Sequence, residues 1–221
     1  MDYDFQWTLV YRDWDLLASG LLVTYYVTVL AMALALVLGL VLALMRLAQQ
    51  RWLSMLAHGY VELLRSLPLY VFLLWIYFGL AFAADIIFEP IQAGVLALGL
   101  ITAAYMAEIY RAGIQSVDRG QYQAARALGL TTPQIYRDVV LPQAFRTILP
   151  AAGNQFVGAF KGAAIVSVIG VEDLMYWARE FSLEFFKPFE FYTVAGVLLI
   201  ASTLVFAGVV AIIEQRMRQG R

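Results

Sequence analysis

A few polar side chains lie inside long apolar stretches of this sequence, and they are the residues that could do chemistry. Lys161 is the only charged residue between Thr147 and Val171. If this stretch crosses a bilayer, a charge near its centre costs about 2.5 to 3.5 kcal/mol on insertion scales, so Lys161 is expected to face a cavity or a partner. Asn154, Gly158 and Lys161 share one helical face by their spacing and could line a common path. This pattern predicts recognition of an anionic group such as a carboxylate.

Two interpretations of these polar residues are open from the sequence alone. The first is a substrate pathway whose candidate residues are Asn154, Gln155, Lys161 and Glu108. The second is structural: Lys161 pairs with Glu108 or Glu62, because charges inside a membrane usually pair, and the two amides bond to neighbouring helices.

Enzyme chemistry and metal binding find little support in the sequence. The chain has no cysteine and a single histidine, His58, which excludes disulfides, thiolate chemistry and clustered histidine sites. The phosphate loop Gly-x-x-x-x-Gly-Lys-Ser/Thr does not occur, so this chain is not an ATPase. We therefore expect no catalytic residues, no metal, no cofactor bound by this chain and no nucleic-acid partner.

The elements that must position these residues are membrane helices. The sequence is 62% hydrophobic and 14% charged, whereas soluble domains carry about 25% charged residues. A helix needs about 20 apolar residues to cross the hydrocarbon core. Uncharged or nearly uncharged runs predict an all-α, polytopic membrane protein with five spans, at about residues 16–45, 66–84, 90–110, 147–171 and 191–213. The step Leu67-Pro68 is expected to start or kink the second span.

The basic residues orient these spans. With the N-terminus outside and the C-terminus in the cytoplasm, 11 Lys and Arg residues lie inside and 3 outside, with Lys161 in the membrane. Basic residues accumulate on the cytoplasmic side of short loops, so this orientation is predicted over its inverse.

The predicted cytoplasmic loop, residues 118–142, has the punctuation of two short helices. Asp118 can cap the first helix, and Gly129 stands where helices often end in a left-handed residue. Thr132 followed by Pro133 is expected to cap and begin the second helix, which runs through Val140.

The end and the surface of this loop also carry signals. The pair Leu141-Pro142 is expected to stop the second helix. An apolar stripe of Ile135, Val139 and Val140 suggests a docking surface. The alternative is an interfacial helix pair that lies on lipid headgroups.

The loop resembles the EAA motif of ABC importer permeases, which reads EAA, three residues, Gly, nine residues, Ile, one residue, Leu-Pro. The spacing fits throughout, although Gln123 replaces the glutamate and Val139 replaces the isoleucine. The matching residues are Gln123, Ala124, Ala125, Gly129, Val139, Leu141 and Pro142.

Other segments are similar to the permeases of polar amino acid importers, the histidine, glutamine and glutamate type. They are residues 61–80, 104–117 and 161–174. In the last segment the family usually has Lys-Asp-Thr-Ser-Leu, whereas here Gly162-Ala163-Ala164 follow the lysine. This loss of an acid and hydroxyls leaves a net positive stretch, which favours an acidic or neutral substrate over a cationic one. The resemblance covers the chain from about Gly20 to its end.

This resemblance implies a single transmembrane domain over residues 1–221 with the MetI-like fold, located in a bacterial inner membrane among lipids. The 118–142 loop would dock on an ABC ATPase dimer, which binds ATP and Mg. An extracytoplasmic solute-binding protein would deliver the substrate, and a second permease copy or a homologous permease would complete the pathway. The alternative class is a freestanding secondary transporter or channel with Lys161 and Glu108 as a charge relay.

Overall fold

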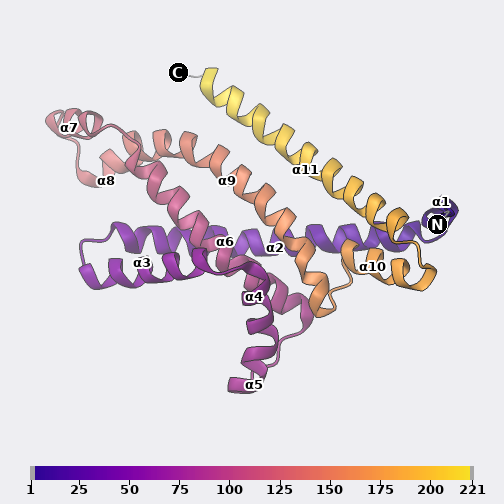
Figure 1. Ribbon diagram of the computed structural model, residues 1–221. Helices are drawn as coiled ribbons and strands as arrows, with labels where there is room; N and C mark the ends of the chain where they lie inside the picture. The colour runs from indigo at the N-terminus through magenta and orange to yellow at the C-terminus, as the bar shows by residue number, and fades with distance from the viewer. Residues whose placement is uncertain (1–2, 220–221) are drawn as a thin grey trace.

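The computed structural model describes residues 3–219, and that part of the chain is built from helices without a β-strand. Figure 1 shows an elongated molecule in which the long helix α2 is crossed obliquely by α6 and α9, while α11 runs beside α9. The all-α class predicted from the sequence is confirmed.

The observed helix bounds can be compared with the segments predicted from the sequence. In chain order the helices are α1 (Trp7–Arg12), α2 (Trp14–Leu47), α3 (Arg51–Ser66), α4 (Leu69–Leu74), α5 (Leu80–Ala84), α6 (Pro90–Gln115), α7 (Arg119–Ala127), α8 (Thr132–Ile135), α9 (Leu141–Ala163), α10 (Leu174–Phe185) and α11 (Pro188–Gln219). Three short elements join them: π-helical turns at Trp75–Gly79 and Tyr136–Val140, and a 3-10 helix at Ala164–Ile169.

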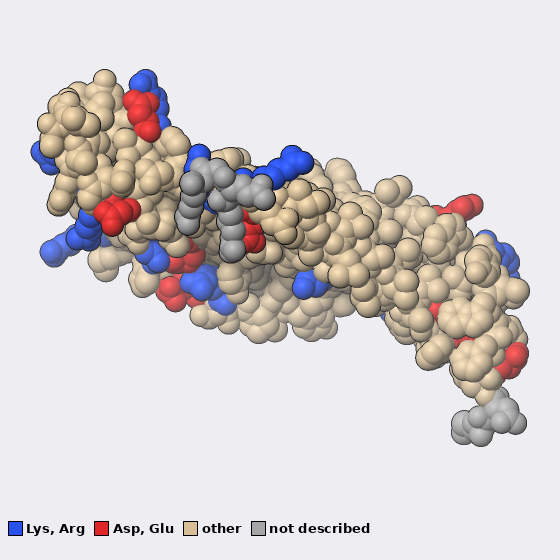
Figure 2. All heavy atoms as spheres, turned by 90° about the horizontal axis from the view of Figure 1, so that it is seen from above, with Lys and Arg blue, Asp and Glu red and all other residues tan. Residues whose placement is uncertain are grey.

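Within residues 3–219, three helices are long and apolar enough to cross a membrane, namely α2, α6 and α11. The segments Arg51–Ser66 and Leu69–Ala84 qualify together as a fourth span, bent by 106°. The predicted span at residues 147–171 overlaps α9 and the 3-10 helix after it, which Asn154, Gln155 and Lys161 make more polar than the other predicted spans. The span count of five and the orientation of the termini stay predictions. Figure 2 shows an uncharged band across the molecule, with charged side chains gathered toward its two ends.

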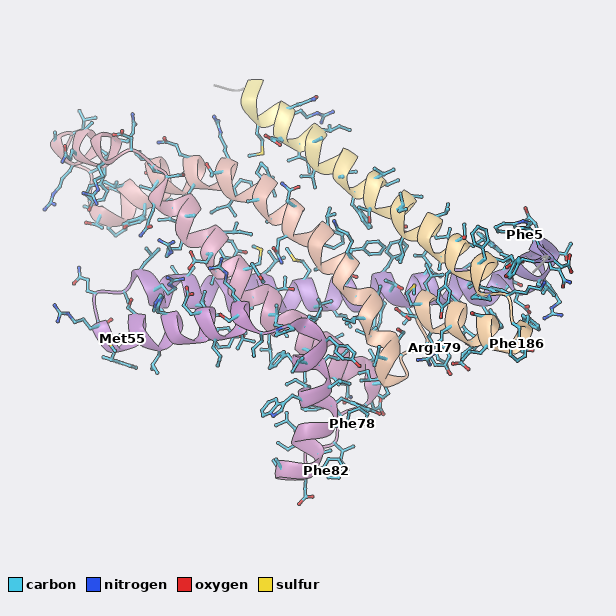
Figure 3. All side chains as sticks on the ribbon, viewed as in Figure 1. Phe5, Met55, Phe78, Phe82, Arg179 and Phe186 are labelled. Atoms are coloured by element: carbon cyan, nitrogen blue, oxygen red, sulfur yellow. The ribbon has the colours of Figure 1, made fainter. Side chains whose placement is uncertain are left out.

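The sharp bend in the second predicted span lies at Leu67 and Pro68, as expected. Leu67 is extended, with φ −84° and ψ 134°, because the ring of the following proline disfavours the helical region. The helix α3 before the bend was not predicted. One of its faces is buried, with the residues Ala57, Val61 and Leu64. Beyond the bend, the arm formed by α4 and α5 projects from the body, with Phe78 and Phe82 along it (Figure 3).

A large part of the main core lies between α2 and α6. Small residues dominate this seam, and close backbone approach between membrane helices depends on such residues. A Cβ on Gly39 of α2 would lie 2.6 Å from Met106 Cβ and 3.0 Å from the Ala103 carbonyl oxygen on α6. A Cβ on Gly99 of α6 would lie 2.7 Å from Leu34 Cδ2. The two helices therefore pack backbone against backbone.

The opposite end of the molecule from the loop has its own small core. Helix α10, which the sequence did not predict, packs with α1 and the start of α11 around Leu17, Leu174 and Phe191. The Glu190 carboxylate, fully buried, accepts hydrogen bonds from Tyr3 Oη at 2.5 Å and from the Gln6 backbone N–H at 2.8 Å. These bonds attach the segment before α1 to the start of α11.

Candidate coupling loop and translocation pathway

The first helix of the loop forms as predicted. Asp118 caps α7 through a hydrogen bond from the Gly120 N–H to Asp118 Oδ1 at 2.5 Å. Gly129 follows α7 in the left-handed region, with φ +82°. The Leu130 N–H then donates to the Ala125 carbonyl oxygen at 3.2 Å, so the turn closes back on the end of the helix.

The second helix begins one residue earlier than predicted. Thr131, not Thr132, is its N-cap, with extended backbone angles of φ −71° and ψ 156°. Its N–H donates to Gln134 Oε1 at 2.8 Å, and Pro133 lies in the first turn, where no N–H is needed. The prediction of Thr132 as the cap was wrong because Gln134, three residues after Thr131, completes a capping box there.

The predicted stop at Leu141-Pro142 is also wrong. The chain passes from α8 through the π-helical turn Tyr136–Val140 directly into α9, with the Leu141 N–H donating to the Tyr136 carbonyl oxygen. The wider turn relieves the clash that a proline ring makes with the preceding turn of an α-helix. The Gln143 side chain donates to the Val139 carbonyl oxygen at 2.9 Å. One continuous helical rod therefore leads from the loop, at residue 132, to residue 163.

The apolar stripe of the loop faces inward, so the stripe itself is not available to a partner, and the prediction that the loop is a docking surface stays a prediction. Ile135 and Val140 are buried and form a small core with Ala125, and Val139 packs against it partly buried. Ile114, at the end of α6, also packs against this core. The stripe is apolar because it fixes α8 against α7 and α6.

The residues that match the EAA motif divide into two groups. Ala125 and Val139 belong to the internal core just described, whereas the others are exposed: Gln123, Ala124, Gly129, Leu141 and Pro142. Two large neighbours, Leu128 and Tyr136, are exposed beside them. The outer surface of the loop thus carries the motif residues that a partner could contact.

The polar face predicted on α9 is present. Asn154, Gly158 and Lys161 are exposed, and Gln155 is partly buried on the adjacent side of the helix. On the other side, a Cβ on Gly162 would lie 3.2 Å from Leu69 Cδ2 and 3.3 Å from Leu98 Cδ1. The helix therefore turns its small, packed side toward α4 and α6 and leaves its polar side open.

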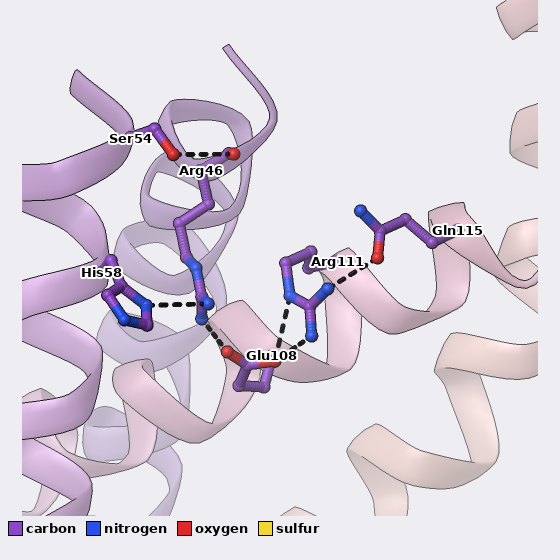
Figure 4. A network of polar contacts seen from close by, with 6 residues as sticks. All are labelled: Arg46, Ser54, His58, Glu108, Arg111 and Gln115. Atoms are coloured by element: carbon purple, nitrogen blue, oxygen red, sulfur yellow. Dashed lines mark hydrogen bonds and ion pairs between the residues drawn. The ribbon is translucent and has the colours of Figure 1, made fainter. Parts of the chain in front are cut away.

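Lys161 does not pair with an acid in the part of the chain that the structure describes, residues 3–219. The structural alternative, an ion pair of Lys161 with Glu108 or Glu62, is therefore wrong for a single copy. Glu108 instead bonds to two arginines, as Figure 4 shows. The structure brings Asn154 and Lys161 together on one face but places Glu108 in a different cluster.

The cluster around Glu108 joins three helices and was not predicted from the sequence. Glu108 on α6 forms ion pairs with Arg46 of α2 and, at 2.7 Å, with Arg111 one turn further along α6 (Figure 4). Arg46 Nη2 lies 3.1 Å from His58 Nδ1 of α3, and the Ser54 hydroxyl donates to the Arg46 carbonyl oxygen at 3.2 Å. The spacing of three residues between Glu108 and Arg111 could have predicted their ion pair on one helix. Nothing in the sequence near Glu108 indicated that Arg46 would join them.

Asp173 is a second polar residue that the sequence did not single out. It is fully buried between the 3-10 helix and α10, and its Oδ1 caps α10 by accepting from the Tyr176 N–H at 2.9 Å. Its Oδ2 has no hydrogen-bond partner among the described residues. Burial raises the pKa of Asp173 to about 7, although the backbone N–H groups of α10 oppose this shift.

Known proteins share this architecture over the whole chain. Residues 8–219 match the family described as "Binding-protein-dependent transport system inner membrane component". The "Probable glutamine ABC transporter permease protein GlnM" of Bacillus subtilis (strain 168) is 34% identical over 96% of this chain and 98% of its own length. The "Histidine/lysine/arginine/ornithine transport system permease protein HisQ" of Escherichia coli (strain K12) is 32% identical over 96% and 97%.

Solved structures agree with the sequence relatives. A chain of the "Crystal structure of an amino acid ABC transporter with histidines" superposes with a TM-score of 0.93 at 38% identity, covering 97% of this chain and 100% of that one. A chain of the MetNI methionine ABC transporter shares the fold, with a TM-score of 0.70 at 22% identity. The chain therefore belongs to the family of binding-protein-dependent transport system inner membrane components, and its relatives within it are permease subunits of amino-acid ABC transporters.

Proposed function

We propose that this chain is the permease subunit of an ATP-driven importer for a polar amino acid or an amino-acid derivative in a bacterial inner membrane. The observation that carries the proposal is the helical rod from residue 132 to residue 163, which joins the loop to the polar face of α9. A rigid element passes on a displacement that a flexible loop would absorb. The rod therefore connects a motor on the cytoplasmic side with the residues that would meet the solute.

The loop, residues 118–142, is the surface for a separate ABC ATPase dimer, which supplies ATP and Mg. In this proposal the partner contacts the exposed motif residues Gln123, Ala124, Gly129, Leu141 and Pro142, while Ala125 and Val139 hold the loop in shape. Gln123 lacks the negative charge of the motif's glutamate, so its contact with the ATPase is a hydrogen bond without charge assistance.

The pathway is completed by a second permease copy or a homologous permease. The polar face of α9 is open in the single chain, and five spans make a thin wall that a two-fold partner would close. An extracytoplasmic solute-binding protein delivers the amino acid. Lys161, together with Asn154 and Gln155, forms the candidate contact surface, whereas Glu108 lies in the separate cluster with Arg46 and Arg111.

A charge relay of a freestanding transporter is the weaker candidate. It would use Lys161 and Glu108 in succession, but the Glu108 carboxylate is held by Arg46 and Arg111. It also gives no purpose to the capped loop.

The proposal is tested by co-purification in detergent with the ATPase subunit. Gly129 has φ +82°, a region that a β-branched residue reaches only with strain, so Gly129→Val should distort the loop and abolish retention of the ATPase. Gly59→Val is the matched control, since Gly59 has open space around it and ordinary helical geometry. Wild type and Gly59→Val should retain the ATPase. Substrate transport by the purified chain alone, without ATP, would contradict the proposal.

A further inference from the structure

The polar cluster around Glu108 lies where α6 leads into the coupling loop. Helix α6 ends at Gln115, and α7 of the loop begins at Arg119. The Arg111 guanidinium bonds to Glu108 Oε2 with Nε at 3.0 Å and Nη2 at 2.7 Å, and its Nη1 donates to Gln115 Oε1 at 2.6 Å. The last turns of α6 are thus braced by their own side chains up to the point where the loop starts.

Arg46 extends the cluster to the two helices that precede α6. Its side chain is 12% exposed, and that of Glu108 is 19% exposed, so the ion pair lies largely out of solvent. Through its contacts with Glu108, His58 and Ser54, Arg46 ties the end of α2 and the start of α3 to α6 (Figure 4). Other contacts between the α2–α3 hairpin and α6 lie further from the loop: Tyr60 Oη of α3 donates to the Leu100 carbonyl oxygen at 3.0 Å, and Gly39 of α2 packs on Met106. The ion pair adds a directional, charged contact near the end of α6 from which the loop leads off.

The charges of the cluster make Glu108 the residue on which it depends. One carboxylate serves two guanidinium groups, and these would repel each other if Glu108 were neutral. A partly buried ion pair adds little net stability, because desolvation offsets its attraction, but loss of one partner leaves an uncompensated charge. Such pairs are therefore better suited to select one arrangement of helices than to strengthen the fold.

We infer that Glu108 is a positioning residue for coupling: by binding Arg46 it locks the α2–α3 hairpin to α6, so that a displacement of the loop moves these helices as one body. The inference rests on the proposed function and adds a second route from the loop into the membrane beside the α8–α9 rod. It also assigns Glu108 to the mechanics of the transporter and not to contact with the solute.

The test uses the complete transporter, reconstituted with its ATPase subunits and the loaded binding protein. Glu108→Gln should leave the basal ATP hydrolysis and the recovery of the complex within about twofold of wild type. It should reduce the stimulation of ATP hydrolysis by the loaded binding protein, and uptake, by about fivefold or more. The KM for the loaded binding protein should stay unchanged, because Glu108 does not contact that protein in this proposal. A merely local structural defect would instead lower the basal and the stimulated rates of ATP hydrolysis together.

Two further variants keep the test decisive. Glu62→Gln is the matched control for loss of a nearby negative charge alone, because Glu62 is exposed on α3, acts on Arg46 only through space and forms no ion pair in the described part of the chain. If Glu108→Gln does not fold, Arg46→Lys keeps the charge but loses the forked geometry and should give an intermediate loss.

The outcomes separate this inference from the proposed function. Full stimulation in Glu108→Gln, or wild-type stimulation in Arg46→Lys, would each overturn the inference alone. A raised KM for the transported amino acid with normal stimulation would instead place Glu108 at the solute. If wild type itself recruits no ATPase, the proposed function fails.

Discussion

Lys161 presents an exposed ammonium group on α9, and no acid of the described chain neutralises it. Gly162, Ala163 and Ala164, which follow it, offer no acid or hydroxyl. In a pathway of low dielectric constant such a cation attracts carboxylates and repels cations. The names of the relatives cover glutamine as well as cationic amino acids, so the prediction for this chain rests on its local charge.

We predict that Lys161→Met lowers the apparent affinity for the transported amino acid by about tenfold or more, the size of a lost charge-assisted hydrogen bond. Lys161→Arg should retain much of the affinity. Competition of uptake by glutamine, glutamate, arginine and lysine measures the preference, which should shift toward the cationic amino acids in Lys161→Met. Preferential uptake of arginine or lysine by the wild type would refute this assignment.

Asp173 predicts a dependence of stability on pH. Its folded-state pKa of about 7 lies above the unfolded value of about 3.9. The folded chain therefore holds the extra proton between about pH 4 and about pH 7, and the contribution of this group to stability falls as the pH rises through that window. Asp173→Asn, which keeps a capping oxygen, should flatten this decline.

Thermal unfolding of the detergent-solubilised protein at about pH 5 and about pH 8 checks the prediction, because these values lie on either side of the titration. Glu172→Gln is the control. Glu172 directly precedes Asp173 and is exposed, so this exchange should leave the dependence of stability on pH as in the wild type. Equal slopes in wild type and Asp173→Asn would show that Asp173 does not titrate in this range.

At the scale of the elements, the close seam between α2 and α6 is sensitive to substitution. Gly39→Ala would place a Cβ 2.6 Å from Met106 Cβ and should destabilise the protein by about 1 to 3 kcal/mol, as overpacking does. Gly208→Ala on α11 is the matched control, because nothing lies within 4 Å of its Cβ position. Thermal unfolding compares the two, and equal stability would mean that the seam can relax.

Local signals predicted those elements whose boundaries depend on neighbouring residues only. The cap at Asp118, the left-handed Gly129 and the bend at Pro68 follow from backbone preferences and were found. Pro142 shows the limit, because a π-helical turn before it let the helix continue. Such a turn is stabilised by the packing of Ile135 and Val140 on α6 and α7, which the local sequence does not specify.

The helices α3 and α10 were missed for a different reason. Both carry charged residues and are short, at 16 and 12 residues, so a search for long uncharged runs passes over them. Their positions depend on burial against α2, α6 and α11, as the residues Ala57, Val61 and Leu174 show. The shared face of Asn154, Gly158 and Lys161 on α9 could be predicted from their spacing. The ion pair of Arg46 with Glu108 could not, because the two residues are 62 positions apart and meet only in the folded chain.

At the scale of the whole molecule, the orientation across the bilayer follows from charge. The loop end, with α7 and α8, and the end with α1 and α10 lie at opposite extremes of the molecule (Figure 1). The predicted orientation places the first in the cytoplasm and the second outside. The chain has no cysteine, so a single introduced thiol reports on one position only.

We expect a membrane-impermeant thiol reagent added to intact cells to label Glu184→Cys, near the end of α10. Gln121→Cys, on α7, should react only after the cells are permeabilised; both residues are exposed. The cysteine-free parent is the control for background labelling. The opposite pattern would place the loop on the wrong side for an ATPase and would remove the basis of the proposed function.

The continuity of α8 with α9 also limits how the solute path can change. Because Asn154, Gly158 and Lys161 occupy one flank of a single unbroken cylinder, a twist of that cylinder about its long axis swings all of them in the same sense at the same moment. Wetting and charge along the conduit would then switch together, without separate rearrangement of each side chain. In the proposed function, the path would open or close according to the rotation angle of this helix.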